Sequence, residues 1–430
     1  MTPISNWCRC TSCHAGYGWK DRHFDFTIEE NVDCLVCHDT TGTYEKYPTD
    51  CGHPAYEEKK FGARVFKPVN LSEVAQLVGR PRGENCGACH FYGGGGDGVK
   101  HGDLDSSLLK ADKRLDVHMA AKGGKFNCTA CHTTINHDIA GRYYATPAPV
   151  RRQLALPDDY GNRMACESCH SATPHKKNKK LNDHTDKVAC QTCHIPRYAR
   201  GGVYTKMWWD WSTAGRFDAE GNVVVEKDGA GNVTYHSKKG DMRWAKDVVP
   251  TYVWYNGNMK YVDLLDVIDD QQPVRLNQPQ GSYDDPGARI FPFKFYRGKQ
   301  VYDPVNKTLA IPKLFGKKGS GAYWADYDWE QSVKAGMAEA QAAFSGQIGF
   351  VETEMFWPIT HMVAPKEESL PCADCHRREG RLASLGGFYL PGRDKSTVLD
   401  LLGVVLVLLS LAGVIAHGTM RILRRRREEQ

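Results

Sequence analysis

The sequence predicts a fold of mainly short α-helices and loops packed around an array of covalently bound groups, with a small β-containing aromatic insert and a C-terminal transmembrane helix. Three observations lead to this prediction. A cysteine-rich motif of five residues occurs seven times in the 430-residue chain. The mean hydropathy is −0.52, with 42 glycines and 21 prolines, which does not describe a large apolar core. One long apolar stretch lies near the C-terminus.

The repeated motif is C-x-x-C-H, which indicates attachment of haem c. Its two thiols add across the vinyl groups of a porphyrin, and the adjoining imidazole binds the iron. Zinc ribbons and disulfide frameworks also use paired cysteines, but they do not require a histidine directly after each pair. The repeats therefore predict a multihaem cytochrome c with seven haem c sites. The predicted attachment cysteines are Cys10, Cys13, Cys34, Cys37, Cys86, Cys89, Cys128, Cys131, Cys166, Cys169, Cys190, Cys193, Cys372 and Cys375, and the predicted histidine ligands in the motifs are His14, His38, His90, His132, His170, His194 and His376.

The formal charge of +5 does not indicate a nucleic-acid-binding protein. Each haem would add two propionates and one positive charge on the ferric porphyrin, which brings the holoprotein to about −2. No nucleic-acid partner is therefore expected.

The chain should be exported, because thioether attachment takes place outside the cytoplasm. It begins MTPISNW, without the basic and apolar regions of a signal peptide. We therefore expect the true N-terminus to lie upstream of Met1.

The motifs divide the chain into a haem-dense domain at residues 1–200 with six motifs, a haem-free insert at 201–350 and a last haem segment at 351–395. Short polar segments with many glycines separate the first six motifs, which favours single-turn helices over a sheet.

The insert is rich in aromatic residues. Aromatic clusters lie at 207–211, 252–255 and 291–296, a β-hairpin is predicted over 222–235, and apolar residues at helical spacing predict a helix over 329–345. We expect this insert to cover and shield the haem array rather than to form a separate catalytic domain, because aromatic rings bury large areas.

Residues 397–416 are apolar apart from three positions and predict a transmembrane helix within 396–420, since about 20 residues cross a hydrocarbon core. A buried core helix is the alternative, but little sequence follows for it to pack within. A basic tail at 421–430 contains five arginines. The positive-inside tendency places this tail in the cytoplasm and the haem domain in the periplasm of a bacterial inner membrane.

Histidines outside the motifs are candidates for the second axial ligand, because low-spin electron-transfer haems need two strong ligands. His236 lies in the predicted hairpin and His417 at the cytoplasmic end of the span, which excludes both. The remaining candidates are His23, His53, His101, His118, His137, His175, His184 and His361. A haem that performs chemistry must keep one coordination position for substrate, so one motif haem should lack a histidine pair.

Five blocks of sequence are more specific than the haem motif alone. They are CTSCHAGYGWKD at 10–21, DCLVCHDTTG at 33–42, HFYGGGG at 90–96, VKHGDLD at 99–105 and ACQTCHIP at 189–196. These blocks resemble the octahaem tetrathionate reductase family of multihaem cytochromes. The resemblance covers most of the chain to about residue 211 and the last motif.

This resemblance implies eight haems, seven of them with paired histidines and one catalytic haem whose iron binds a lysine. The lysine falls on Lys100, and the catalytic haem is the one attached at Cys10 and Cys13. Cys8 and Asp21 match the cysteine and aspartate that flank the catalytic iron. Which face of the iron Lys100 occupies, and what His14 does, stay open. The eighth haem is expected upstream of Met1, together with the export signal.

The expected function is reduction of tetrathionate, nitrite or hydroxylamine, with electrons from a quinol-linked or cytochrome donor. Cys8 would act as a thiolate on a sulfane sulfur, and Asp21 would relay protons. Two alternatives stay open. One is a non-catalytic electron-transfer protein that passes quinol-derived electrons to a partner reductase, and the other is oxidation of reduced nitrogen or sulfur in the opposite direction.

Overall fold

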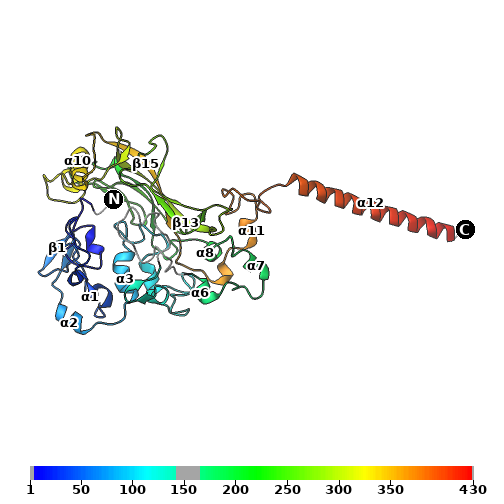
Figure 1. Ribbon diagram of the computed structural model, residues 1–430, viewed down its shortest axis with the longest axis horizontal. Coiled ribbons are helices and arrows are strands. Elements are labelled where there is room, and N and C mark those ends of the chain that lie inside the picture. The colour runs from blue at the N-terminus through cyan, green and yellow to red at the C-terminus, as the bar shows by residue number, and fades with distance from the viewer. Residues whose placement is uncertain (1–3, 142–164, 429–430) are drawn as a thin grey trace. The chain divides into compact units, whose positions relative to one another are not determined.

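The computed structural model describes residues 4–141 and 165–428. The chain forms two compact units, Met1–Leu370 and Pro371–Gln430. The first unit contains six motifs and the aromatic insert, and the second contains the last motif and the apolar C-terminal stretch (Figure 1). The predicted boundary at residue 350 falls at the start of a strand, Gly349–Pro358. The insert and the first six motifs belong to the same compact unit.

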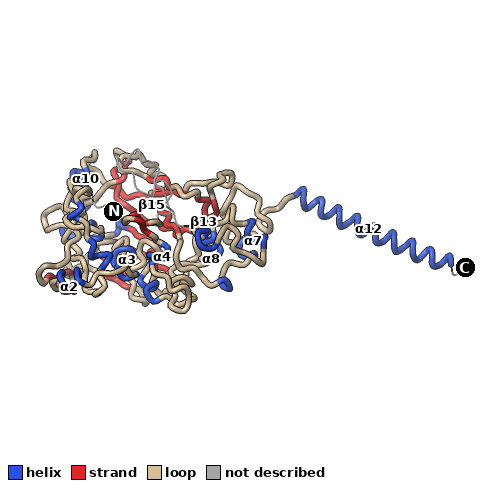
Figure 2. The backbone as a smooth tube through the Cα atoms, turned by 60° about the horizontal axis from the view of Figure 1, so that its bottom comes forward, coloured by secondary structure: helices blue, strands red, loops and turns tan. Residues whose placement is uncertain are grey.

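Each motif forms about one helical turn, because a turn brings residues i and i+3, here the two cysteines, to the same side. At the second motif, the carboxylate of Asp33 accepts a hydrogen bond from the Val36 N–H and so starts the helix. The motif helices are α1 (Cys34–His38), α3 (Gly83–His90), α4 (Cys128–Cys131), α6 (Glu167–His170), α8 (Cys190–His194), α11 (Cys372–Cys375) and the 3-10 helix η1 (Thr11–Cys13). Figure 2 shows these short helices set in long loops, as predicted.

The helix predicted in the insert forms as α10 (Trp329–Ala340). Asp328 caps its N-terminus by accepting a hydrogen bond from the Gln331 N–H. It ends earlier than predicted because Gln341 adopts a left-handed conformation with φ of 54°. Other short helices in the described residues are α2 (Leu71–Gln76), α7 (Lys179–Asp183), α9 (Tyr323–Asp326), and the 3-10 turns η2 (Glu29–Asn31), η3 (Ser106–Lys110), η5 (Trp211–Thr213) and η6 (Lys366–Glu368).

The insert is built on a nine-stranded sheet, which is larger than the small β-containing insert that the sequence predicts. The strands run in the order β11-β15-β13-β5-β8-β7-β6, and β9 and β14 also pair with β13. The bounds are β5 (Thr205–Asp210), β6 (Val225–Lys227), β7 (Val233–His236), β8 (Gly240–Ala245), β9 (Thr251–Tyr255), β11 (Val274–Arg275), β13 (Arg289–Asp303), β14 (Thr308–Leu309) and β15 (Gly349–Pro358). The antiparallel pair β6–β7 confirms the predicted hairpin.

Three two-stranded sheets lie outside this large sheet in the described part of the chain. They pair β1 (Lys59–Phe61) with β2 (Arg64–Phe66), β3 (Thr134–Ile135) with β4 (Asp138–Ile139), and β10 (Met259–Tyr261) with β12 (Asn277–Pro279).

Strand β13 is the centre of the insert, and its 15 residues pair with β15, β5, β9 and β14. Its buried Phe291 and Phe293 pack with Tyr255 and Phe356. A second buried cluster of the sheet contains Trp209, Trp211 and Tyr323. The aromatic residues therefore supply the sheet with its own core.

The same strand also reaches the haem-dense segments. The Ala189 N–H donates to the Ile290 carbonyl over 3.0 Å, and the Ile290 N–H donates to the Lys187 carbonyl over 2.7 Å. These bonds tie β13 to the segment that starts α8. The predicted role of the insert as a shield for the haem array stays a prediction.

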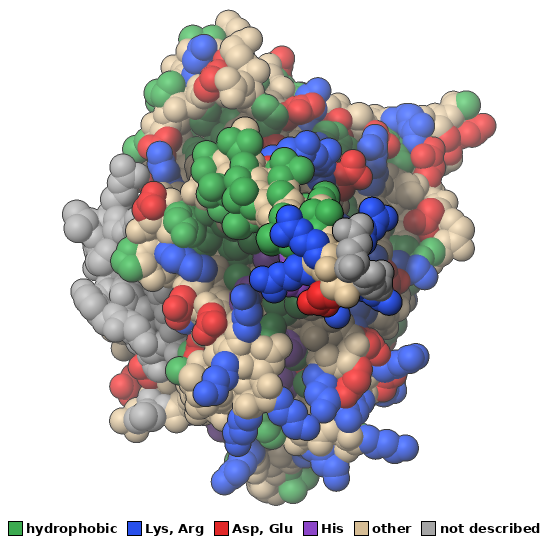
Figure 3. Space-filling view, turned by 90° about the vertical axis from the view of Figure 1, so that its right-hand side faces the viewer, with side chains coloured by type: hydrophobic (Ala, Val, Ile, Leu, Met, Phe, Trp, Pro, Cys, Tyr) green, Lys and Arg blue, Asp and Glu red, His purple; other side chains and the backbone are tan. Residues whose placement is uncertain are grey.

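Helix α12 (Thr397–Glu428) is the main element of the second unit. The helix has 32 residues, and at a rise of about 1.5 Å per residue its length exceeds the roughly 30 Å thickness of a hydrocarbon core. No residue of its most apolar stretch is buried. The helix is thus long and apolar enough to cross a membrane. The helix extends into the predicted basic tail, so its last turn carries arginines. Figure 3 is drawn from the side on which this end of the helix lies.

Candidate haem sites

The motif histidines are held in the orientation that a haem ligand requires. The Nδ1 atom of His38 lies 2.8 Å from the Gly79 carbonyl, and that of His132 lies 2.9 Å from the Ala140 carbonyl. In the second unit, Nδ1 of His376 lies 3.0 Å from the Pro391 carbonyl. An Nδ1–H that donates to a carbonyl leaves the lone pair on Nε2 for the iron. These residues therefore fit haem c.

Four motif histidines face a second histidine from elsewhere in the chain. A metal–nitrogen bond to imidazole is about 2 Å long, so two rings on opposite sides of one iron have centroids about 6 Å apart. The pairs are His38 with His137 at 6.2 Å, His118 with His170 at 6.1 Å, His132 with His361 at 6.4 Å and His175 with His194 at 6.1 Å. The spacing matches six-coordinate iron at the second, fifth, fourth and sixth motifs.

Thiols of different motifs also lie side by side, which gives the order of the sites in space. The thiols within hydrogen-bonding distance are Cys13 with Cys89, Cys86 with Cys128, and Cys166 with Cys190. Cys131 is close enough to Cys169 for their charges to interact. The first, third, fourth, fifth and sixth motifs therefore form a series of neighbours, which suits electron transfer between adjacent sites.

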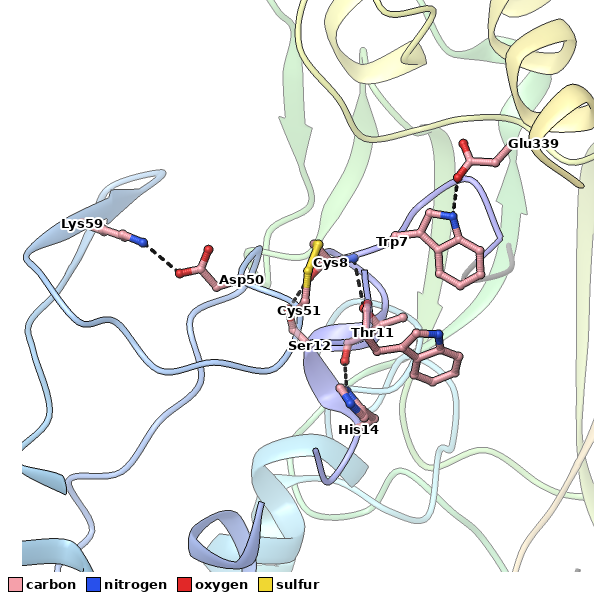
Figure 4. The surroundings of a disulfide bond; sticks show 10 residues. Trp7, Cys8, Thr11, Ser12, His14, Asp50, Cys51, Lys59 and Glu339 are labelled. Atoms are coloured by element: carbon pink, nitrogen blue, oxygen red, sulfur yellow. Dashed lines mark hydrogen bonds and ion pairs between the residues drawn. A yellow bond between two sulfur atoms is a disulfide. The ribbon is translucent and has the colours of Figure 1, made fainter. Parts of the chain in front are cut away.

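The histidine of the first motif has the same Nδ1 anchoring, but its other ring nitrogen is buried. Nδ1 of His14 contacts the Thr11 carbonyl, as Figure 4 shows, while Nε2 is buried and has no hydrogen-bond partner. A β-carbon added to Gly16 or Gly52 would lie 2.9 Å from the ring of His14, so both backbones press against its edge. The predicted role of His14 as an iron ligand stays a prediction.

Cys8 forms a disulfide with Cys51 (Figure 4). The expectation that Cys8 acts as a free thiolate is therefore wrong for this structure. No local pattern indicates this pairing across 43 residues, but the cysteine count gives a signal, because fourteen of the 16 cysteines lie in motifs and only Cys8 and Cys51 remain. The bond instead ties the start of the first motif to the loop that contains Gly52 and covers His14.

Lys100 lies beside the third motif, close to His90 and to Trp357. Its Nζ is 4.4 Å from the centre of the Trp357 ring, and burial lowers the pKa of its amine. The pKa of His90 is lowered mainly by burial, with a contribution from the charge of Lys100, so the amine lies close to this third-motif histidine. A lysine must lose its proton before its nitrogen can bind a metal, and burial favours the neutral form.

Known cytochromes share this architecture. Residues 206–379 match the family model described as "Cytochrome c bacterial". The crystal structure of an octaheme cytochrome c from Shewanella oneidensis is similar, with a TM-score of 0.76 and 44% identity over 89% of this chain and 80% of that chain. The chain belongs to the octahaem cytochrome c family.

As an octahaem cytochrome, the protein is a c-type redox protein that carries haem c. An uncharacterized protein of Archaeoglobus fulgidus is 32% identical over 139 residues, which is 30% of this chain and 46% of that protein. The chain thus spans less than half of this relative's length. The predicted number of seven haem sites in this chain stays a prediction.

Three further residues with predicted roles at the haem sites, Asp21, His23 and His53, lie in the N-terminal segment. The Asp21 carboxylate accepts a hydrogen bond from the His23 N–H over 2.8 Å, and His23 is exposed. His53 stacks on Tyr17, with ring centroids 5.2 Å apart, and its Nδ1 lies 3.1 Å from the Tyr56 hydroxyl. The predicted roles of Asp21, His23 and His53 stay predictions.

Two distal candidates lie in more constrained surroundings. His101 lies with its ring centroid 5.4 Å from that of Trp357, and burial lowers its pKa to about 3. Nδ1 of His184 lies 2.9 Å from the Lys180 carbonyl, which is the same kind of anchoring as in the motifs.

Sequence reasoning missed two residues that support these ligands. Asp103 accepts hydrogen bonds from the His361 N–H over 2.9 Å and from its ring Nδ1 over 3.1 Å, so it orients the partner of His132. The fully buried Lys294 contacts the main chain of Lys100. The sequence contained a signal for Asp103, because this residue lies in the VKHGDLD block that carries the family resemblance. For Lys294, the FPFKFY run shows a lysine among aromatic residues in a strand but gives no indication of its partner.

Proposed function

We propose that this octahaem cytochrome is a membrane-anchored reductase of small inorganic sulfur or nitrogen compounds, namely tetrathionate, nitrite or hydroxylamine, and that it acts at an iron ligated by Lys100. The observation that carries the proposal is the contrast at the first motif. Nε2 of His14 is buried without a hydrogen-bond partner, and the lysine amine of Lys100 lies close to His90 of the third motif, whose Cys89 contacts Cys13 of the first. An iron without a histidine pair is what a catalytic site requires.

Haem c, when bound, supplies one-electron transfer and an iron whose axial ligands tune its chemistry. Lys100 would hold this iron through its neutral amine, which burial favours. Arg9 is close enough to the Cys13 thiol to interact with it by charge, so it would attract an anionic substrate to the first motif. Asp21 would carry protons from the exposed N-terminal segment.

The proposal also places the protein in a bacterial inner membrane. Helix α12 would anchor it, with the arginines of its last turn on the cytoplasmic side and the Met1–Leu370 unit in the periplasm. A quinol-linked or cytochrome donor would then supply electrons at the membrane surface. Removal of residues 397–430 should release a soluble haem protein with unchanged turnover towards an artificial donor. Continued sedimentation of this shortened protein with membranes would contradict the anchor.

Steady-state turnover of the full-length holoprotein tests the proposal directly. Lys100→Ala should abolish reduction of tetrathionate, nitrite and hydroxylamine, because it removes the ligand that distinguishes the first motif. Lys122→Ala is the matched control, since Lys122 is exposed and lies outside the site. Unchanged turnover in Lys100→Ala, at full haem content, would refute the role of Lys100.

A non-catalytic electron-transfer protein is the second candidate. The four complete histidine pairs and the series of neighbouring thiols favour it, because both features serve transfer rather than substrate binding. Absence of turnover with all three substrates, together with rapid electron exchange with a soluble cytochrome, would favour this candidate over the reductase.

A further inference from the structure

Lys294 is a buried cation of strand β13 that reaches into the haem-dense part of its unit. Its side chain is fully buried. Its Nζ donates to the Val99 carbonyl over 2.7 Å, to the Lys100 carbonyl over 3.2 Å and to the Thr205 hydroxyl over 2.6 Å. An ammonium has three donors, and here each has an acceptor.

Burial of the Lys294 ammonium does not improve the packing of the core. Among the described residues, no carboxylate lies within ion-pair distance of Lys294. Taking an ammonium out of water is unfavourable, and an apolar side chain of similar volume often fits such a position with equal or greater stability. A contribution other than core stability therefore accounts best for a lysine here.

The three hydrogen bonds of Lys294 converge on one short segment of main chain. Two go directly to the carbonyls of Val99 and Lys100. The third goes to Thr205, whose hydroxyl donates to the Gly98 carbonyl over 2.7 Å. The carbonyls of three consecutive residues are thus fixed by one side chain and its hydroxyl partner from the sheet.

The main chain of Lys100 is also held on its amide side. Its N–H donates to the Gly93 carbonyl over 3.1 Å. With the N–H and the carbonyl both bonded, the backbone of Lys100 has little freedom, and the direction in which its side chain leaves the backbone is set. A metal ligand gains from such support, because a shift of about 1 Å at a reacting centre can cost about 100-fold in rate.

We propose that Lys294 is a positioning residue that holds the Gly98–Val99–Lys100 main chain, and thereby the amine of Lys100, against the iron that this amine ligates. This inference rests on the proposed function, since it requires Lys100 to be a ligand. It gives the aromatic insert a second role beside covering the haem array. Lys294 itself touches neither substrate nor iron.

The experiment uses the full-length holoprotein and records the near-infrared magnetic circular dichroism bands that report the axial ligands of ferric haem. Lys294→Met removes all three hydrogen bonds at similar volume. Lys206→Met is its matched control, because Lys206 is also a buried lysine of this sheet but lies over Trp209, 3.4 Å from the ring centre. Thr205→Val removes only the hydroxyl link, and Thr205→Ser keeps it.

In Lys294→Met, the band of the lysine-ligated haem should weaken or shift while the bands of the histidine pairs stay. Turnover should fall about 100-fold, mainly in kcat. Thr205→Val should show the same change to a smaller degree, and Lys206→Met and Thr205→Ser should match the wild type. Wild-type bands and kcat in Lys294→Met at full haem content would overturn the inference.

If Lys294→Met does not accumulate as holoprotein, the comparison of Thr205→Val with Thr205→Ser decides, and equal bands in these two variants would overturn the inference. Lys100→Ala separates this failure from failure of the proposed function. If Lys100→Ala loses the lysine band but Lys294→Met keeps it, only the positioning role is wrong. If Lys100→Ala leaves every band unchanged, the proposed function and the inference fail together.

Discussion

The first and fourth motifs have the same five-residue pattern, but the structure gives their histidines different surroundings. His132 of the fourth motif is anchored through Nδ1 to the Ala140 carbonyl and faces His361. A glycine backbone lies against both rings, Gly141 beside His132 and Gly16 and Gly52 beside His14 of the first motif, but of the two only His14 has an Nε2 that is buried without a partner. The motif therefore fixes where a haem is attached, but the surrounding chain decides what binds its iron.

The first motif is held in this arrangement by a buried polar network that has no counterpart among the contacts of His132. The Nζ of Lys46 donates to the His14 carbonyl over 2.7 Å and to the Gly16 carbonyl over 2.8 Å, and it lies 3.0 Å from the Asp33 carboxylate. Asp33 also starts helix α1 of the second motif. The network thus couples the orientation of His14 to the neighbouring motif.

The largest expected effect is at the fourth motif. His361→Ala should convert one haem from a bis-imidazole low-spin signal to a high-spin signal, because it removes the ligand opposite His132. Electron paramagnetic resonance of the oxidised holoprotein measures both signals. His236→Ala, at a histidine of strand β7 that is not a candidate ligand, is the control and should leave the spectrum unchanged. An unchanged spectrum in His361→Ala would contradict the assignment of His361 as the ligand opposite His132.

The next effect concerns the network behind the first motif. Asp33→Ala should lower the free energy of unfolding by about 3–5 kcal/mol, because it leaves the nearly buried Lys46 without its carboxylate. Glu45→Ala, which breaks the exposed pair of Glu45 with Arg64, should cost less than about 1 kcal/mol. Chemical denaturation of both variants measures the difference. Equal small losses would show that the network does not hold the first motif.

The disulfide near the first motif should have a similar or smaller effect. Cys8→Ser should lower the free energy of unfolding by about 2–4 kcal/mol, since the bond closes a long loop. Turnover of the folded variant should be retained, because Cys8 is not a free thiol. The same loss should follow in Cys51→Ser. Abolished turnover in folded Cys8→Ser but not in Cys51→Ser would restore Cys8 as a reacting group.

The smallest expected effect on the free energy of unfolding is at Asp303, the last residue of strand β13. This carboxylate lies outside the first and fourth motifs and serves as a reference for them. Burial raises the pKa of Asp303, but hydrogen bonds from Asn306 and Ser345 outweigh it, so the pKa lies below its usual value. A lowered pKa contributes stability above the unfolded value of about 3.9. That contribution is lost as the pH falls through the folded value.

Asp303→Asn should therefore lower the free energy of unfolding by about 1–3 kcal/mol at pH 7. The difference from the wild type should shrink below about pH 4. Denaturation at a series of pH values measures it, and a difference that does not depend on pH would contradict this assignment.

Local features of this molecule could be predicted from its sequence. The motif helices, the hairpin β6–β7 and helix α10 depend on residues a few positions apart, and their patterns give them correctly. The long apolar helix α12 follows from composition alone. The supply of histidines predicted that pairs would form. It could not assign His361 to His132, because that pairing depends on the path of the whole chain.

The features that the sequence could not predict are all contacts between distant segments. Strand β13 pairs in parallel with β5, Arg297 opposite Trp208, and no local pattern indicates that register. The Cys8–Cys51 bond and the bonds of Lys294 to Val99 and Lys100 are of the same kind. The orientation of His14 depends on Gly52, which lies in another loop.

The central claim is that the haem of the first motif is ligated by Lys100 and differs from those with histidine pairs. Near-infrared magnetic circular dichroism of the oxidised full-length holoprotein, compared with Lys100→Ala, tests it most directly. The account predicts one haem without bis-imidazole coordination in the wild type, whose signal is lost or converted in Lys100→Ala while the remaining signals persist. A spectrum in which every haem has imidazole on both sides of the iron, unchanged by Lys100→Ala, would contradict it.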